Sequence, residues 1–230
     1  MINLKTITIV EAVLAATMTM QAYATPIILF NTGVDSTGTP LSDGTVGDPH
    51  YTLTSVPAGS TSAIRIITSA GGFPIGPFIG DNALSAWIGP NNDEDLNGPN
   101  GSYIYRNTFD LTGFDPSTAA ITGGWSTDNN GLDILLNGIS LGPTTTAFNQ
   151  FQLGFSPFTI TSNFNSNINT LDFVVNNGVA NSEGGPTALR VQMTGTADPR
   201  GQVPEPASLA LTGLGLVGLV GLGFARKPPV

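Results

Sequence analysis

Alternating oxygen donors in one short acidic segment are the first candidate for chemistry. Asp93, Asp95 and Asn97 are spaced two residues apart, and Gly98 follows where a calcium-binding loop would turn. Calcium takes about six to eight oxygen ligands, and a bound cation offsets the repulsion between clustered carboxylates. The position where an EF-hand needs its bidentate acid is Ile104. The spacing predicts Ca²⁺ as the candidate cofactor, with a solvated acidic loop as the alternative.

A second candidate surrounds the Trp of the segment 124–130. A sugar-binding site needs an aromatic face to stack on a pyranose ring and polar groups to bind its hydroxyls. Trp125 or Trp87, together with Asp128 and Asn129 on an expected turn, could supply both. A Trp beside a strand is more often part of the core, so packing and turn formation are the competing interpretation.

Groups suited to catalysis are scarce. The chain has no Cys, which excludes a Cys nucleophile, a thiolate metal site and disulfides. Its one His, His50, follows an Asp-Pro pair, and no Gly-x-Ser-x-Gly motif is present, so we expect His50 to be a turn residue. Carboxylates for glycoside hydrolysis are available, but no pair stands out. We therefore expect a protein that is not an enzyme.

Strands must position these residues, because residues 25–198 show strand patterns and almost nothing helical. Asn137-Gly138 is typical of a two-residue type I′ hairpin turn, and Gly123-Gly124 reads as another turn. Arg106 lies in a strand pattern, where an ion pair to a neighbouring strand is expected. The expected strands cover residues 26–30, 50–56, 63–67, 102–111, 132–136, 158–161, 169–176 and 188–195.

Apolar residues alternate along three of these strands and should mark the core-facing side. Short antiparallel strands without intervening helices predict an all-β fold, an antiparallel β-sandwich or jelly roll, over residues 25–198. The alternating residues are Tyr103, Tyr105, Phe109 and Leu111, then Leu171, Phe173 and Val175, and finally Leu189, Val191 and Met193.

The N-terminal segment, residues 1–24, has the pattern of a secretory signal peptide. Lys5 precedes an apolar run, and Ala22 and Ala24 form the small-x-small pattern at which signal peptidase cleaves. We therefore expect the chain to be exported.

The C-terminal segment combines a proline motif, an apolar span and a basic end. After a linker at 199–203, Pro204 and Pro206 flank Glu205 and keep the chain extended. Residues 207–225 carry no charge and approach the roughly 20 residues that a transmembrane helix needs. Arg226 and Lys227 follow as the flank that stays in the cytoplasm. The span predicts a single transmembrane helix, with a plain membrane anchor as the alternative interpretation.

This order of features, over residues 204–230, resembles the PEP-CTERM sorting signal of Gram-negative bacteria. The resemblance implies processing by an exosortase and an association with exopolysaccharide and biofilm. The block from residue 85 to 196, with SAWIGP, GGWSTDNNGLDILLNG, NTLDFVVNN and ALRVQMTGTA, resembles the common ectodomain of PEP-CTERM proteins. That ectodomain is similar to galactose-binding-like jelly rolls, which are accessory modules of many carbohydrate-active enzymes.

Charge limits the partners. The net charge is −9, and the segment between residues 25 and 203 holds no Lys and only four Arg, Arg65, Arg106, Arg190 and Arg200. Such a surface repels phosphate backbones, which excludes nucleic acid and suits neutral glycans or bound cations.

Together these features predict an exported, non-catalytic structural or binding component of the cell surface or extracellular matrix. Its expected partners are signal peptidase and exosortase during export, the membrane through the C-terminal helix, and extracellular polysaccharide. Two alternatives stay open. One is a lectin-like module with a defined glycan ligand, which an exposed Trp would indicate, and the other is an adhesin that binds proteins through an apolar patch.

Overall fold

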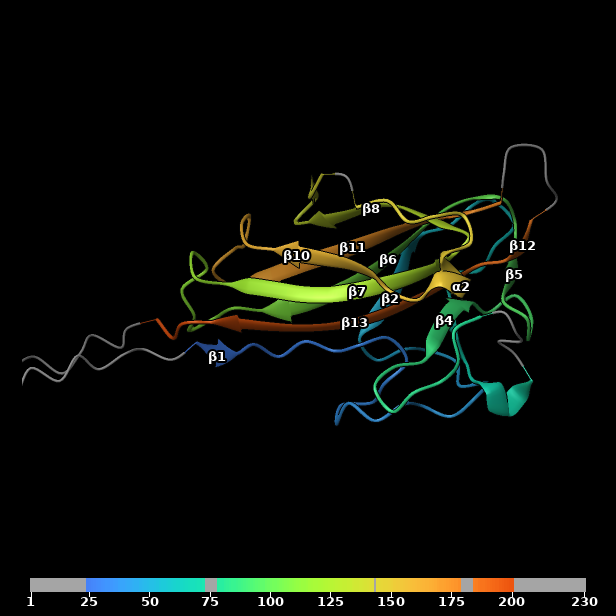
Figure 1. The fold of residues 1–230 in the computed structure, drawn as a ribbon, viewed down its shortest axis with the longest axis horizontal. Helices are drawn as coiled ribbons and strands as arrows, with labels where there is room; N and C mark the ends of the chain where they lie inside the picture. Colours follow the sequence, from blue (N-terminus) through green and yellow to red (C-terminus); the bar gives the residue numbers. More distant parts are fainter. Residues whose placement is uncertain (1–23, 73–77, 143, 179–183, 201–230) are drawn as a thin grey trace, which may run out of the picture. The chain divides into compact units, whose positions relative to one another are not determined.

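The computed structural model describes residues 24–72, 78–142, 144–178 and 184–200 (Figure 1). Contacts gather residues 24–200 into one compact unit. Several predictions lie outside the described residues: the signal peptide with Ala22, the helix at 207–225, and the sorting residues Pro204, Glu205, Pro206, Arg226 and Lys227. No helix in the described part of the chain combines the length and apolar character needed to cross a membrane.

The first sheet has six strands, in the order β10-β7-β13-β4-β3, with β1 added along β13. Its long central strands, β7 and β13, pair over nine residues, from Ala188 opposite Asp128 to Thr196 opposite Ala120. The strands are β1 (Thr25–Pro26), β3 (Ile64–Ile67), β4 (Trp87–Pro90), β7 (Ala120–Asp128), β10 (Ser156–Ile160) and β13 (Ala188–Ala197).

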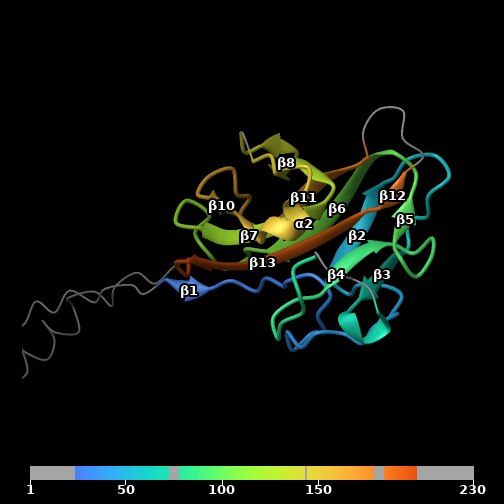
Figure 2. The same cartoon turned by 45° about the vertical axis from the view of Figure 1, so that its right-hand side comes forward.

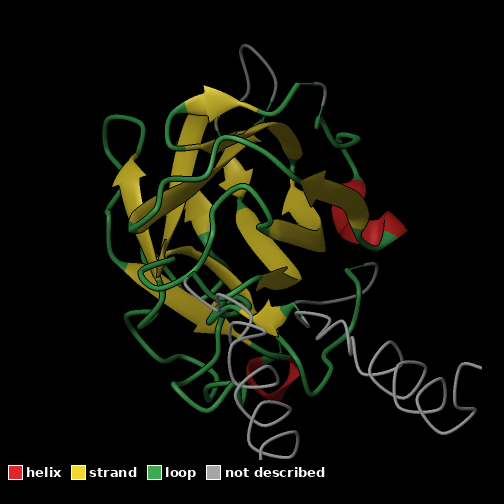
Figure 3. Cartoon of the chain, turned by 90° about the vertical axis from the view of Figure 1, so that its left-hand side faces the viewer, coloured by secondary structure: helices red, strands yellow, loops and turns green. Residues whose placement is uncertain are grey.

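The second sheet has five strands, in the order β2-β6-β11-β8-β9, and β5 pairs with β12 in a separate small ladder. The strands are β2 (Tyr51–Ser55), β5 (Asn97–Gly98), β6 (Gly101–Asp110), β8 (Asn130–Leu136), β9 (Ile139–Ser140), β11 (Ile168–Asn177) and β12 (Gly185–Pro186). Two short helices, the 3₁₀ helix η1 (Ser69–Gly71) and α2 (Gln150–Leu153), complete the elements in Figure 3.

The two sheets pack face to face, which confirms the predicted antiparallel β-sandwich. All ten strand pairs are antiparallel. Rings from both sheets meet between them: Phe173 of β11 lies 5.8 Å from Trp125 of β7 and 5.9 Å from Phe158 of β10. The residues that alternate in the sequence are all buried in this core, as predicted. The arrangement fits a jelly-roll ectodomain.

The predicted hairpin is also confirmed. Asn137 and Gly138 have φ values of 54° and 79°, the positive values that a type I′ turn requires. They connect β8 to β9, which pair directly on either side of the turn.

The predicted turn at Gly123-Gly124 is wrong, because both glycines lie inside β7. A Cβ on Gly123 would lie 2.5 Å from the Gln192 carbonyl oxygen, and one on Gly124 would lie 2.8 Å from the Phe155 Cβ. Close packing, and not chain reversal, accounts for these glycines. The same error hid β7, and β4 was also absent from the predicted strands.

Candidate functional site

The site forms where the chain crosses from one sheet to the other at one end of the sandwich. Asp128 is the last residue of β7, and β8 begins at Asn130, so Asp128 and Asn129 connect the two layers. The peptide bond between them is cis. The structure therefore places both predicted polar residues, Asp128 and Asn129, at this end of the sandwich.

A hydrogen-bond network fixes this crossing. Asn129 Nδ2 donates to Asp128 Oδ1 at 2.9 Å, and the amide of Gly178 donates to Asn129 Oδ1. The Asn129 amide donates to the Asn176 carbonyl at 3.3 Å. Asn129 thus ties the crossing to the end of β11 and orients the Asp128 carboxylate.

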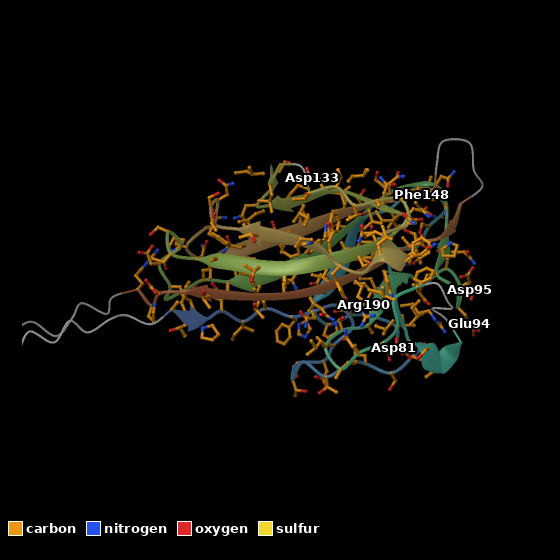
Figure 4. All side chains as sticks on the ribbon, viewed as in Figure 1. Asp81, Glu94, Asp95, Asp133, Phe148 and Arg190 are labelled. Atoms are coloured by element: carbon orange, nitrogen blue, oxygen red, sulfur yellow. The ribbon has the colours of Figure 1, made fainter. Side chains whose placement is uncertain are left out.

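A pocket of about 380 Å³ opens beside Asp128 and Asn129, and we call it the Phe148 pocket. Three phenylalanines, Phe78, Phe148 and Phe151, form its apolar walls. Phe148 is 49% exposed, so much of its ring is open to solvent at the rim (Figure 4). The other lining residues are Asn177, Gly178, Gly184, Gly185 and Pro186.

Backbone contacts hold the segment that carries Phe148. Two residues before it, the Thr146 amide donates to the Gly131 carbonyl at 3.0 Å, and the Gly131 amide donates to Thr146 Oγ1 at 2.6 Å. After it, Ser126 Oγ on β7 donates to the Gln150 carbonyl of α2 at 3.1 Å. Phe148 is therefore held between β8 and β7.

The inner aromatic wall rests on a buried Trp. The Phe78 and Phe151 rings lie 4.5 Å apart, and Phe78 meets Trp87 edge-on at 5.4 Å. Trp87 Nε1 donates to the Ile79 carbonyl at 3.2 Å, and the Ile79 amide donates to the Phe151 carbonyl at 2.8 Å. These contacts make the wall rigid.

Burial changes the electrostatics of the pocket. Because Asp128 is only 3% exposed, desolvation raises the pKa of its carboxyl to about 7. A titratable group with a strongly raised pKa in an aromatic pocket is the combination that marks candidate functional sites.

Trp125 has no place in this site. It is fully buried between the sheets, and a Cβ on Gly131 would collide with its ring. Trp87 is fully buried as well. We therefore correct the prediction that Trp125 stacks on a ligand: it packs in the core, and the exposed aromatic beside Asp128 and Asn129 is Phe148.

The acidic segment at 91–98 closes on itself. Asp93 Oδ1 accepts from the amides of Asp95 (3.0 Å) and Asn97 (2.9 Å), and Asp93 Oδ2 accepts from Asn97 Nδ2 (3.0 Å). Within the described ranges, no three His, Asp or Glu side chains come close enough to hold a metal ion. Asp95 and Glu94 lie at one edge of the molecule, far from Asp133 (Figure 4). These hydrogen bonds of Asp93 with Asp95 and Asn97, the predicted calcium ligands, close the loop.

Two other predicted residues have structural partners. Arg106 forms the predicted ion pair, with its Nε 2.6 Å and its Nη2 2.7 Å from the Asp172 carboxylate on β11. His50 stacks on Phe30 with ring centres 3.5 Å apart, and its amide donates to Asp48 Oδ1 as in a turn. Both line a second pocket, of about 380 Å³, on the outer face of the five-stranded sheet.

Sequence reasoning missed a fully buried charge, Arg190 of β13. Its guanidinium donates to Ser85 Oγ, to the Ser85 carbonyl and to the Gly80 carbonyl at 2.8, 3.0 and 2.7 Å. Burial lowers the pKa of Arg190, and the nearby Asp81 opposes that effect (Figure 4). Arg190 thereby secures segment 78–85, which supplies Phe78 to the pocket.

The phenylalanines of the pocket were missed too. Phe148 and Phe151 follow a polar stretch, TTTA, and aromatic residues in such a loop are the signal that could have identified them.

Comparison with known families identifies the C-terminal segment. The PEP-CTERM protein-sorting motif matches residues 202–227. No curated relative and no solved structure matches the chain. The motif indicates an exported protein that an exosortase processes, with transit through the membrane.

Proposed function

We propose that this exosortase-targeted, exported chain is a non-catalytic surface or matrix protein that binds a neutral sugar unit of exopolysaccharide in the Phe148 pocket. One observation carries the proposal: an exposed aromatic ring stands beside a fixed carboxylate and amides in a pocket at the end of a β-sandwich. The galactose-binding-like jelly rolls that the sequence resembles suit this function.

The pocket has the parts that sugar recognition needs. The exposed face of Phe148 can cover the apolar face of a pyranose ring, while the partly buried Asn129, held beside the nearly buried Asp128, supplies polar groups for its hydroxyls. The network around Asn129 holds these groups in place before binding, which lowers the entropic cost of association.

Charge favours a neutral ligand. The net charge of −9 disfavours a sulfated or carboxylated sugar at this pocket. We therefore infer an uncharged hexose unit as the ligand.

The lining also supports a role without catalysis. Glycoside hydrolysis normally uses two carboxyl groups about 5 to 9.5 Å apart. Among the described residues that line the pocket, Asp128 is the single acid.

Replacing Phe148 by Ala tests the proposal. The variant should lose about tenfold or more in affinity for the polysaccharide, because burying an aromatic side chain contributes about 1.5–3 kcal/mol. The measurement is calorimetric titration of the full chain in mild detergent, with the ligand first selected on a glycan array.

Leu153→Ala is the matched control, because Leu153 is also an exposed apolar residue, 63% exposed, and lies on α2 outside the pocket lining. It should bind like the wild type. Equal affinity for the wild type and Phe148→Ala would refute the pocket as the binding site. Binding of a protein partner with no glycan binding would favour the adhesin alternative.

A further inference from the structure

The chain that leads to the sorting motif is hydrogen-bonded to the folded domain, in an arrangement that we call the clasp (residues 113–118 and 198–200). The Asp198 amide donates to Thr118 Oγ1 at 2.8 Å, and the Asp198 carbonyl accepts from the Asp115 amide at 2.8 Å. The Arg200 amide donates to the Gly113 carbonyl at 2.6 Å. The last described residues are therefore part of the fold.

The loop that receives this chain is itself fixed. Asp115 Oδ1 accepts from the amide and the hydroxyl of Ser117, at 2.9 and 2.7 Å. The fully buried Leu111 and the nearly buried Ala119 anchor the two ends of the loop in the core. The clasp is consequently a rigid surface.

The sorting motif lies very close to this surface along the chain. Only Gly201, Gln202 and Val203 separate Arg200 from Pro204. Four extended residues span at most about 14 Å. Pro204 can therefore never be more than about 14 Å from the clasp while the clasp is formed.

The clasp and the Phe148 pocket lie at opposite ends of the sandwich. β13 starts with Ala188 opposite Asp128 and ends with Ala197 opposite Thr25, next to the clasp. Its ten residues cover roughly 30 Å. Figures 1 and 2 both show β1 and the end of β13 at one end, and α2 and β12 toward the other.

We propose that the clasp is the face of the domain that contacts the membrane-embedded enzyme that processes the tail, so that the Phe148 pocket opens away from that enzyme. A processing enzyme must hold the residues on both sides of the bond that it cleaves. With three residues between fold and motif, an enzyme that holds the motif works within about 14 Å of the clasp, which makes the clasp the nearest surface of the domain for it to contact. This inference rests on the sorting function and is independent of what the pocket binds.

Site-specific photocross-linking tests this contact in cells that carry an exosortase inactivated in its active site. The photoreactive residue p-benzoylphenylalanine is placed at Thr112, an exposed residue beside the clasp, or at Phe148 as the matched position at the other end. Cross-linked enzyme should form from Thr112, with none above background from Phe148.

A spacer variant completes the test. Ten Gly and Ser residues inserted after Arg200 let the enzyme reach the motif without touching the clasp, so the Thr112 cross-link should disappear while an active exosortase still processes the tail. Equal cross-linking from both positions, or cross-links from Thr112 to lipid only, would overturn the proposal. A wild-type chain that is never processed would instead contradict the sorting function.

Discussion

Asp128 is the residue whose protonation the fold changes most directly. Its pKa rises from an ordinary value of 3.8 to about 7, because burial disfavours the charged carboxylate. Because the pKa of Asp128 is higher in the folded than in the unfolded state, the fold is more stable when the Asp128 carboxyl is protonated than when it is ionised. That stability is complete below about pH 4 and is lost as the pH rises through about 7.

We therefore expect the protein to be less stable at pH 8 than at pH 5, and Asp128→Asn to reduce this difference. Between pH 5 and the folded-state pKa of about 7 lie roughly two pH units, which at roughly 1.4 kcal/mol for each unit set an upper bound of about 3 kcal/mol. Thermal unfolding of both chains at the two pH values measures the effect. Burial also raises the pKa of Asp48, so part of the pH dependence should persist in the variant. An unchanged pH dependence in Asp128→Asn would contradict the assignment.

Single residues also show where sequence reasoning reaches its limit. Asp128 and Asn129 were predicted on a turn, and they lie where β7 ends and β8 begins, while their predicted role in ligand binding stays a prediction. Trp125 was assigned to the same site because a sequence does not tell which side of a strand faces solvent when the strand itself is missed. Phe148 was overlooked because its exposure depends on how Thr146 and Gln150 attach the loop to β8 and β7.

Among the elements, β7 depends on its two glycines. Gly123→Ala places a methyl group against the Gln192 carbonyl and the Phe158 ring, with ideal distances of 2.5 and 2.8 Å. Overpacking of this kind costs about 1–3 kcal/mol. We expect a lower urea midpoint with an unchanged slope.

Gly80→Ala is the control for the Gly123→Ala substitution. Gly80 lies outside β7, and a Cβ there meets nothing within 4 Å. It should unfold like the wild type. If Gly123→Ala is as stable as the control, β13 and β10 do not pack against Gly123 of β7 as described.

Elements with regular alternation or a defined turn could be predicted from the sequence. β6, β11 and β13 follow the alternation within one or two residues, and Asn137-Gly138 allows only a tight hairpin. β7 could not be predicted, because glycines required by close contact with neighbouring strands look the same in the sequence as glycines required by a turn. β4, which pairs with β3 over four positions and with β13 at one, was also absent from the predicted strands.

At the scale of the whole molecule, the two ends of the sandwich carry different features. The clasp end continues into the sorting motif, and the opposite end carries the Phe148 pocket. A domain built in this way can be delivered through one end and bind polymer through the other. The sorting motif is one linear segment, so it could be recognised in the sequence. The Phe148 pocket could not, because its lining residues come from β7, β11, α2 and segment 78–80 and meet only in the folded domain.

The most direct test of this account is where the protein accumulates in exosortase-carrying cells, measured by immunoblot of inner-membrane, matrix and medium fractions. Wild type should appear processed in the matrix, and a chain with Pro204, Glu205 and Pro206 replaced by Ala should stay unprocessed in the inner membrane. Phe148→Ala should be processed normally but be found in the medium, because it binds the polysaccharide of the matrix more weakly. Phe148→Ala retained in the matrix at the wild-type level would contradict the central claim.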